Sequence, residues 1–113
     1  MPKFLMEARF TSGGLEGVRH EGGTARRDVV ERAIESVGGE LESFYFAFGE
    51  YDTYTIMNLP DHESAAALSA AVSSSGAVKA RIVVLLTPEE IDEASKRVVE
   101  YRAPVSEYPA AVV

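Results

Sequence analysis

The chain has 113 residues, the usual size of a single domain, and its 18 acidic and 11 basic residues give a formal net charge of −7. A surface of that charge repels phosphate backbones and anionic bilayers, so we expect neither a nucleic-acid partner nor a membrane partner. The chain has no cysteine and only two histidines, which excludes thiolate sites and disulfides and leads us to expect no metal and no cofactor.

The N-terminal segment does not have the pattern of a signal peptide, because charged residues stand where a signal peptide would be apolar. No segment of the sequence approaches the roughly 20 apolar residues that a bilayer requires. We therefore expect a cytoplasmic protein.

The first segment predicts a strand with one strongly apolar side. Residues 3–10 alternate between a mixed side and an apolar side, the latter formed by Phe4, Met6, Ala8 and Phe10.

The next segment, residues 11–23, holds five glycines and predicts a loop with at most a short turn of helix. Thr24 is placed to cap a helix over 25–37, in which apolar residues recur at helical spacing. Gly38 and Gly39 then end that helix.

The rest of the chain predicts a hairpin, two further helices and a fourth strand. Thr87 begins the last helix: it supplies a threonine cap, with proline at the first helical position and Glu90 three residues after the cap. The expected elements are a strand over 41–48, a turn over 49–52, a strand over 53–59, a helix over 62–75, a strand over 77–86, a helix to about residue 101 and a tail over 102–113.

This order of elements is the split βαβ pattern of ferredoxin-like domains. It predicts an α+β fold, βαββαβ, with an antiparallel four-stranded sheet in the order 4-1-3-2, helices on one face, and an extra C-terminal helix. We expect residues 1–101 to form this one domain and residues 102–113 to form an extended tail.

The hairpin also carries a family resemblance. The segment from Phe44 to Asp52, FYFAFGEYD, precedes an alternating strand and Leu59-Pro60-Asp61, and it resembles the GYD domain family, whose namesake motif lies between the two central strands. The glycine pair after the preceding helix and residues 86–90 fit as well, so the resemblance covers most of residues 3–100. It implies a ferredoxin-like domain similar to the dimeric α+β barrel proteins, and it leaves the activity open.

The face of the sheet away from the helices is expected to be partly apolar. An exposed patch of that size is unusual on a monomer, so we expect the chain to pair with itself as a homodimer or higher homo-oligomer. Acidic and basic residues of the adjacent first and fourth strands are expected to pair across this face. We place on it Leu5, Tyr45, Ala47, Val83 and Leu85, mixed with Glu7, Arg9, Lys79 and Arg81.

Two segments supply candidate polar site residues. Arg19, His20 and Arg26 lie in or beside the glycine-rich segment, where backbone N–H groups at a helix start attract anions. The alternative is that these arginines are solvated or paired with nearby acidic residues. In the turn, Asp52 beside Tyr51 is a candidate acid or base, as is His20. A tight turn requires glycine and aspartate in any case, so a structural role for Asp52 is the alternative.

Tyr45 and Tyr54 are candidate pocket groups. They are expected either to point to opposite environments or to need partners for their hydroxyls, whereas the phenylalanines of the same strands are expected in the core.

Three functions fit these features. The first is a homo-oligomeric module that binds a small, partly apolar molecule, with an acidic group as one option, in a cavity gated by residues 11–23; Arg19, His20 and Arg26 would be its polar contacts. The second is a cofactor-independent enzyme of the dimeric α+β barrel type that uses His20, Asp52 or a tyrosine, and it rests on fold analogy. The third is a protein-interaction or assembly module.

Overall fold

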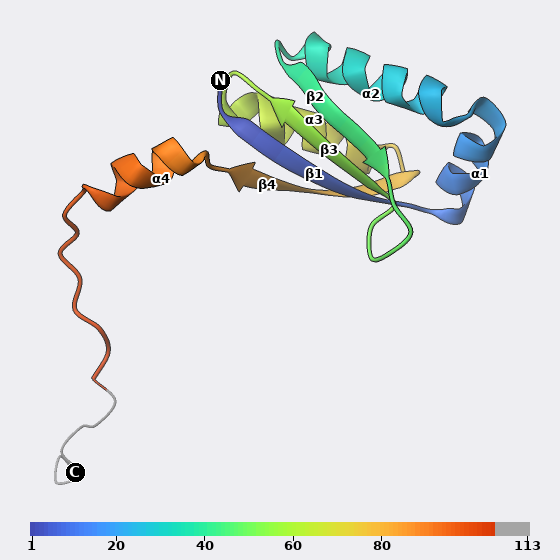
Figure 1. The fold of residues 1–113 in the computed structure, drawn as a ribbon. Helices are drawn as coiled ribbons and strands as arrows, with labels where there is room; N and C mark the ends of the chain where they lie inside the picture. Colours follow the sequence, from blue (N-terminus) through green and yellow to red (C-terminus); the bar gives the residue numbers. More distant parts are fainter. Residues whose placement is uncertain (106–113) are drawn as a thin grey trace, which may run out of the picture.

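The computed structural model describes residues 1–105 and has the α+β architecture expected from the sequence (Figure 1). One antiparallel sheet has the strand order β2-β3-β1-β4, which confirms the predicted ferredoxin-like order. The elements in chain order are β1 (Lys3–Phe10), α1 (Ser12–Glu21), α2 (Gly23–Ser36), β2 (Glu40–Phe46), β3 (Thr53–Asn58), α3 (His62–Ser74), β4 (Val78–Leu85) and α4 (Pro88–Ser95).

The core lies between the sheet and two helices, α2 and α3. The alternation of β1 turns Phe4 and Met6 toward these helices, where they pack with Met57 of β3, Ile34 of α2 and Leu68 of α3. Burying a side chain of this size contributes roughly 1.5–3 kcal/mol. Because both helices cover the same side of the sheet, the opposite side, which we call the outer face, presents strand side chains.

Most of the segment 11–23 forms the helix α1, Ser12–Glu21, and the prediction of a loop was wrong. Thr11 begins the helix: its hydroxyl accepts a hydrogen bond from the Gly14 amide, and its own amide donates to the Ala77 carbonyl at 3.0 Å. A Cβ atom at Gly14 would lie 2.1 Å from that carbonyl oxygen, so the glycine allows α1 to lie directly against the start of β4. Glycine here serves close packing, and this packing outweighs its low helix propensity.

The ends of the other helices differ in detail from the prediction. Thr24 does not cap α2, because α2 begins at Gly23 and the chain turns at Gly22, whose φ of +90° places it in the region that favours glycine. Thr87 and Glu90 form the predicted capping box of α4, but this helix ends at Ser95 and not near residue 101. Residues 96–105 form no helix or strand, and the predicted tail beyond them lies outside the described residues.

The outer face has the mixed surface that the sequence predicted. Leu5 lies opposite Val83, and Glu7 lies opposite Arg81, on the neighbouring strands β1 and β4. The Arg81 guanidinium donates to the Glu7 carboxylate at 3.1 Å, which confirms the predicted ion pair across these strands. This hydrogen bond and the charge of Glu7 raise the pKa of Arg81 above its ordinary value.

Candidate functional site

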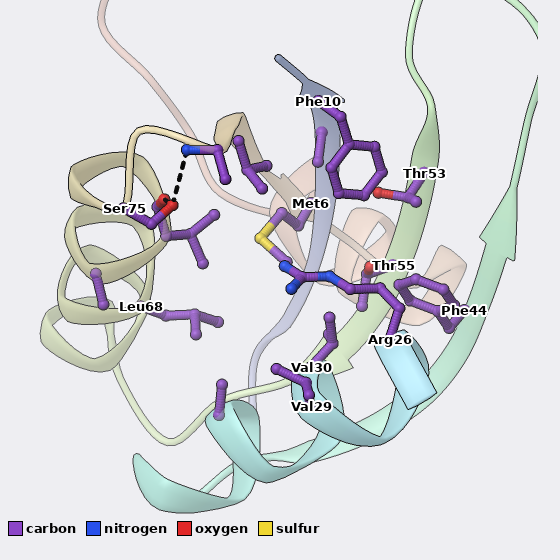
Figure 2. A pocket seen from close by; sticks show the side chains of 16 residues that line it. Met6, Phe10, Arg26, Val29, Val30, Phe44, Thr53, Thr55, Leu68 and Ser75 are labelled. Carbon is purple, nitrogen blue, oxygen red and sulfur yellow. Dashed lines mark hydrogen bonds between the residues drawn. The ribbon is translucent and has the colours of Figure 1, made fainter. Parts of the chain in front are cut away.

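A cavity of about 300 Å³ lies between α2, α3 and the helix-covered side of the sheet (Figure 2). Small side chains such as Ala33, Ala71 and Ala77 leave this space open where larger ones would fill it. The volume is at the lower end of the range typical of small-molecule sites. Most of the wall is apolar, and its polar side chains are Arg26, Thr53, Thr55 and Ser75.

Arg26 is the charged residue of this cavity. It lies in the first turns of α2, and Figure 2 shows its side chain running into the space beside Met6. The guanidinium packs over the Phe10 ring at 5.7 Å, and within residues 1–105 its buried Nε atom has no hydrogen-bond partner and the side chain forms no ion pair. A buried donor without a partner costs about 1–3 kcal/mol.

Thr55 supplies a second unpartnered group on the β3 wall. Its side chain is fully buried, and its hydroxyl oxygen has no hydrogen-bond partner among the described residues. Ser75 differs, because its hydroxyl donates to the Val72 carbonyl and accepts from the Ala77 amide. The cavity wall therefore contains one cationic side chain and three hydroxyl side chains, and it is otherwise apolar.

Of the three candidates near α1, only Arg26 lines the cavity. Arg19 and His20 lie on α1 with side chains that are 74% and 84% exposed. Both approach the Glu16 carboxylate, Arg19 at 3.0 Å and His20 at 4.0 Å. They are thus neighbours on a solvated helix surface, and the structure does not bring them together with Arg26 as lining residues of the cavity.

Tyr45 and Tyr54 lie opposite each other on neighbouring strands of the outer face. Of the two alternatives for this pair, the first, that they point to opposite environments, was wrong, because residues directly opposite in an antiparallel pair share one face of the sheet. Tyr45 is 69% exposed, and neither tyrosine lines the cavity.

The Gly-Glu-Tyr-Asp motif joins the hairpin turn to β1 and β4. The Asp52 carboxylate accepts from the Phe10 amide at 2.8 Å, and the Asp52 amide donates to the Ala8 carbonyl, also at 2.8 Å. The guanidinium groups of Arg9 and Arg81 both pack over the Tyr51 ring, at 5.2 and 5.4 Å from its centroid. Asp52 does not line the cavity, and its contacts support the structural role that the sequence left open.

Thr55 is not among the residues predicted from the sequence, although the strand pattern contains a signal for it. Thr53, Thr55 and Met57 alternate onto the buried side of β3, so two polar residues stand where apolar ones are expected. Arg26 gives the same kind of signal, because it lies one helical turn before the buried Val30. Polar residues at core-facing positions are therefore the signal in the sequence that could have predicted this cavity.

The fold and the cavity define a small ferredoxin-like α+β domain with an apolar internal site. Its sequence places it more narrowly: a model of the GYD domain family matches residues 4–95, and the chain belongs to that family. No curated protein and no solved structure matches the chain. None of the helices within residues 1–105 is both long and apolar enough to cross a bilayer.

Proposed function

We propose that the chain is a homo-oligomeric domain that binds a small, largely apolar molecule with an acidic group in the cavity between α2, α3 and the sheet. One observation carries this proposal: Arg26 and Thr55 line a nearly apolar space, and each has a buried polar atom without a hydrogen-bond partner among the described residues. A ligand that supplies an acceptor to both would remove the cost of their burial.

A carboxylate is the acidic group that suits Arg26 best. It accepts two parallel hydrogen bonds from a guanidinium, and one of its oxygens can also accept from a threonine hydroxyl. At about 30 Å³ per water-sized group, a cavity of about 300 Å³ holds roughly ten non-hydrogen atoms. Octanoate and 3-phenylpropanoate have this size and the required apolar portion.

Binding and not catalysis is the function that this wall supports. Among residues 1–105, Arg26 is the only side chain lining the cavity that carries a charge, and an arginine stays protonated in proteins and does not serve as a base. His20 and Asp52, the candidates for acid–base chemistry, lie elsewhere, so no specific contact favours the enzymatic alternative.

Calorimetric titration of the full chain with octanoate tests the proposal. Arg26→Met should weaken octanoate binding by roughly 10- to 100-fold, because a hydrogen bond to a charged group contributes about 1.5–3 kcal/mol. Octan-1-ol, of equal length and neutral, should bind both proteins alike. Arg27→Met is the matched control, since Arg27 is the exposed neighbour that pairs with Asp28.

Two results would overturn the proposal. One is the absence of any heat or shift in melting temperature with octanoate and 3-phenylpropanoate at millimolar concentration. The other is an Arg26→Met protein that binds octanoate as well as the Arg27→Met control does.

A further inference from the structure

Residues 86–101, which we call the C-terminal arm, present an unusual amount of apolar surface. Figure 1 shows α4 beyond the end of β4, apart from the sheet and from the other helices. The large apolar side chains of the arm are between 49% and 95% exposed, and they are Leu86, Ile91, Val98, Val99 and Tyr101.

An eight-residue helix in that position needs a surface to cover it. Isolated helices shorter than about 12–15 residues are marginal in water. The capping box stabilises the start of α4: the Glu90 carboxylate accepts a hydrogen bond from the Thr87 amide, and this contact lowers the pKa of Glu90. The capping box satisfies backbone groups of the first turn alone. The family match extends to residue 95, so α4 belongs to the domain itself.

Charge indicates which surface covers the arm. The helix α4 carries four carboxylates, those of Glu89, Glu90, Asp92 and Glu93, on a chain whose net charge is already −7. A cationic partner surface is therefore favoured.

The outer face holds such a surface at its other end. A shallow hollow there, the cationic hollow, is lined by Arg9, Lys79 and Arg81 around the Tyr51 ring and Glu50. Arg9 and Arg81 have acidic partners, whereas Lys79 forms no ion pair within residues 1–105.

The arm and the hollow of one chain lie far apart. Lys79 stands near the start of β4 and α4 follows its end, so about 20 Å of strand separates them at roughly 3.3 Å per residue. A two-fold pairing of outer faces with antiparallel strands brings the end of one β4 to the start of the other. That arrangement places the arm of each copy beside the hollow of its partner.

We infer that the C-terminal arm docks on a second copy of this chain, with the carboxylates of α4 against the cationic hollow and with Ile91 covered by the partner. The inference rests on the self-association in the proposed function and adds the exchange of arms to it. The contact is isologous, so each dimer contains it twice.

Reversal of charge on either side of this contact tests the inference. In sedimentation measurements on the full chain at low salt, Glu89→Lys with Glu93→Lys should weaken dimerisation by roughly tenfold, and Lys79→Glu should do the same. Combining the three substitutions should restore the affinity to within about threefold. Glu35→Lys with Glu63→Lys, on helices of the opposite side, is the control and should leave dimerisation unchanged.

Cross-linking separates a partner's arm from the chain's own arm. Because the chain has no cysteine, oxidising a mixture of Lys79→Cys and Glu93→Cys chains should give the mixed disulfide. A wild-type chain that stays monomeric would overturn the self-association together with the exchange. A dimer whose affinity is unchanged by the charge reversals in the arm, or whose cysteines do not cross-link, would overturn the exchange of arms but not the self-association.

Discussion

Asp52 is the residue of the family motif with the clearest structural task. Its carboxylate accepts from the amide of Phe10, the last residue of β1, while its own backbone bonds to Ala8 and Ala47. These contacts hold the hairpin turn against the central strand. The aspartate thus acts as a hydrogen-bond acceptor at the point where the chain returns from the turn.

Replacing this acceptor should destabilise the domain. Asp52→Ala leaves the part-buried Phe10 amide unpaired, and we expect it to lower the free energy of unfolding by about 2 kcal/mol and Tm by roughly 10 °C. Asp52→Asn keeps an acceptor oxygen and should lose less than half of that. Thermal unfolding followed by circular dichroism measures both, with the exposed Glu35→Ala as control. Equal Tm values for Asp52→Ala and the control would contradict this role.

At this scale the sequence predicted the residue types but not their partners. The motif identified the turn, yet the acceptor's partner, Phe10, lies 42 residues earlier in the chain. In the same way, Arg26 was a candidate through its charge, whereas the alternation of β3 marks Thr55 as a polar residue at a core-facing position but does not show that it shares a cavity with Arg26. Long-range contacts of this kind depend on strand register, which a single sequence leaves open until the sheet is known.

Among the elements, α1 shows most clearly how packing overrides propensity. Its glycines predicted a loop, but they differ in role: a Cβ at Gly14 would clash with the Ala77 carbonyl, while a Cβ at Gly17 would meet nothing within 4 Å. The sequence cannot distinguish these glycines, because the difference depends on the position of Ala77, which lies 63 residues after Gly14. The boundaries of β1, β3, α3 and β4 needed no such information and were predicted within one residue.

Two alanine substitutions in α1 should therefore have opposite effects. Gly17→Ala should raise the free energy of unfolding by about 0.5–1 kcal/mol, since alanine loses less backbone entropy than glycine in a helix. Gly14→Ala should lower it by more than 1 kcal/mol, because α1 must move away from β4. Urea unfolding of the two variants beside the wild type measures both values. A Gly14→Ala protein as stable as Gly17→Ala would show that the close approach does not hold α1 in place.

On the scale of the whole molecule, the proposed ligand site and the proposed interface are on opposite sides of the sheet. One chain builds the cavity alone, from α2, α3 and the inner side of the strands. The proposed interface is formed by the outer face, on which three neighbouring strands present Leu5, Ile56 and Val83. The proposed ligand binding and the proposed self-association should therefore be separable by substitution, which the sequence could not show, because it did not reveal on which side of the sheet a pocket lies.

A charge placed in the middle of the outer face should therefore abolish assembly without affecting the cavity. Ile56→Asp places a carboxylate beside Leu5, where pairing of two outer faces would bury it without a partner at a cost of several kcal/mol. We expect light scattering at micromolar concentration to give a multiple of the 12.2 kDa chain mass for the wild type and the single-chain mass for this variant. Ala67→Asp, an equivalent change on the exposed surface of α3, should remain assembled. Octanoate should bind the Ile56→Asp protein as it binds the wild type, and a wild-type chain of 12.2 kDa under these conditions would contradict the outer face as an interface.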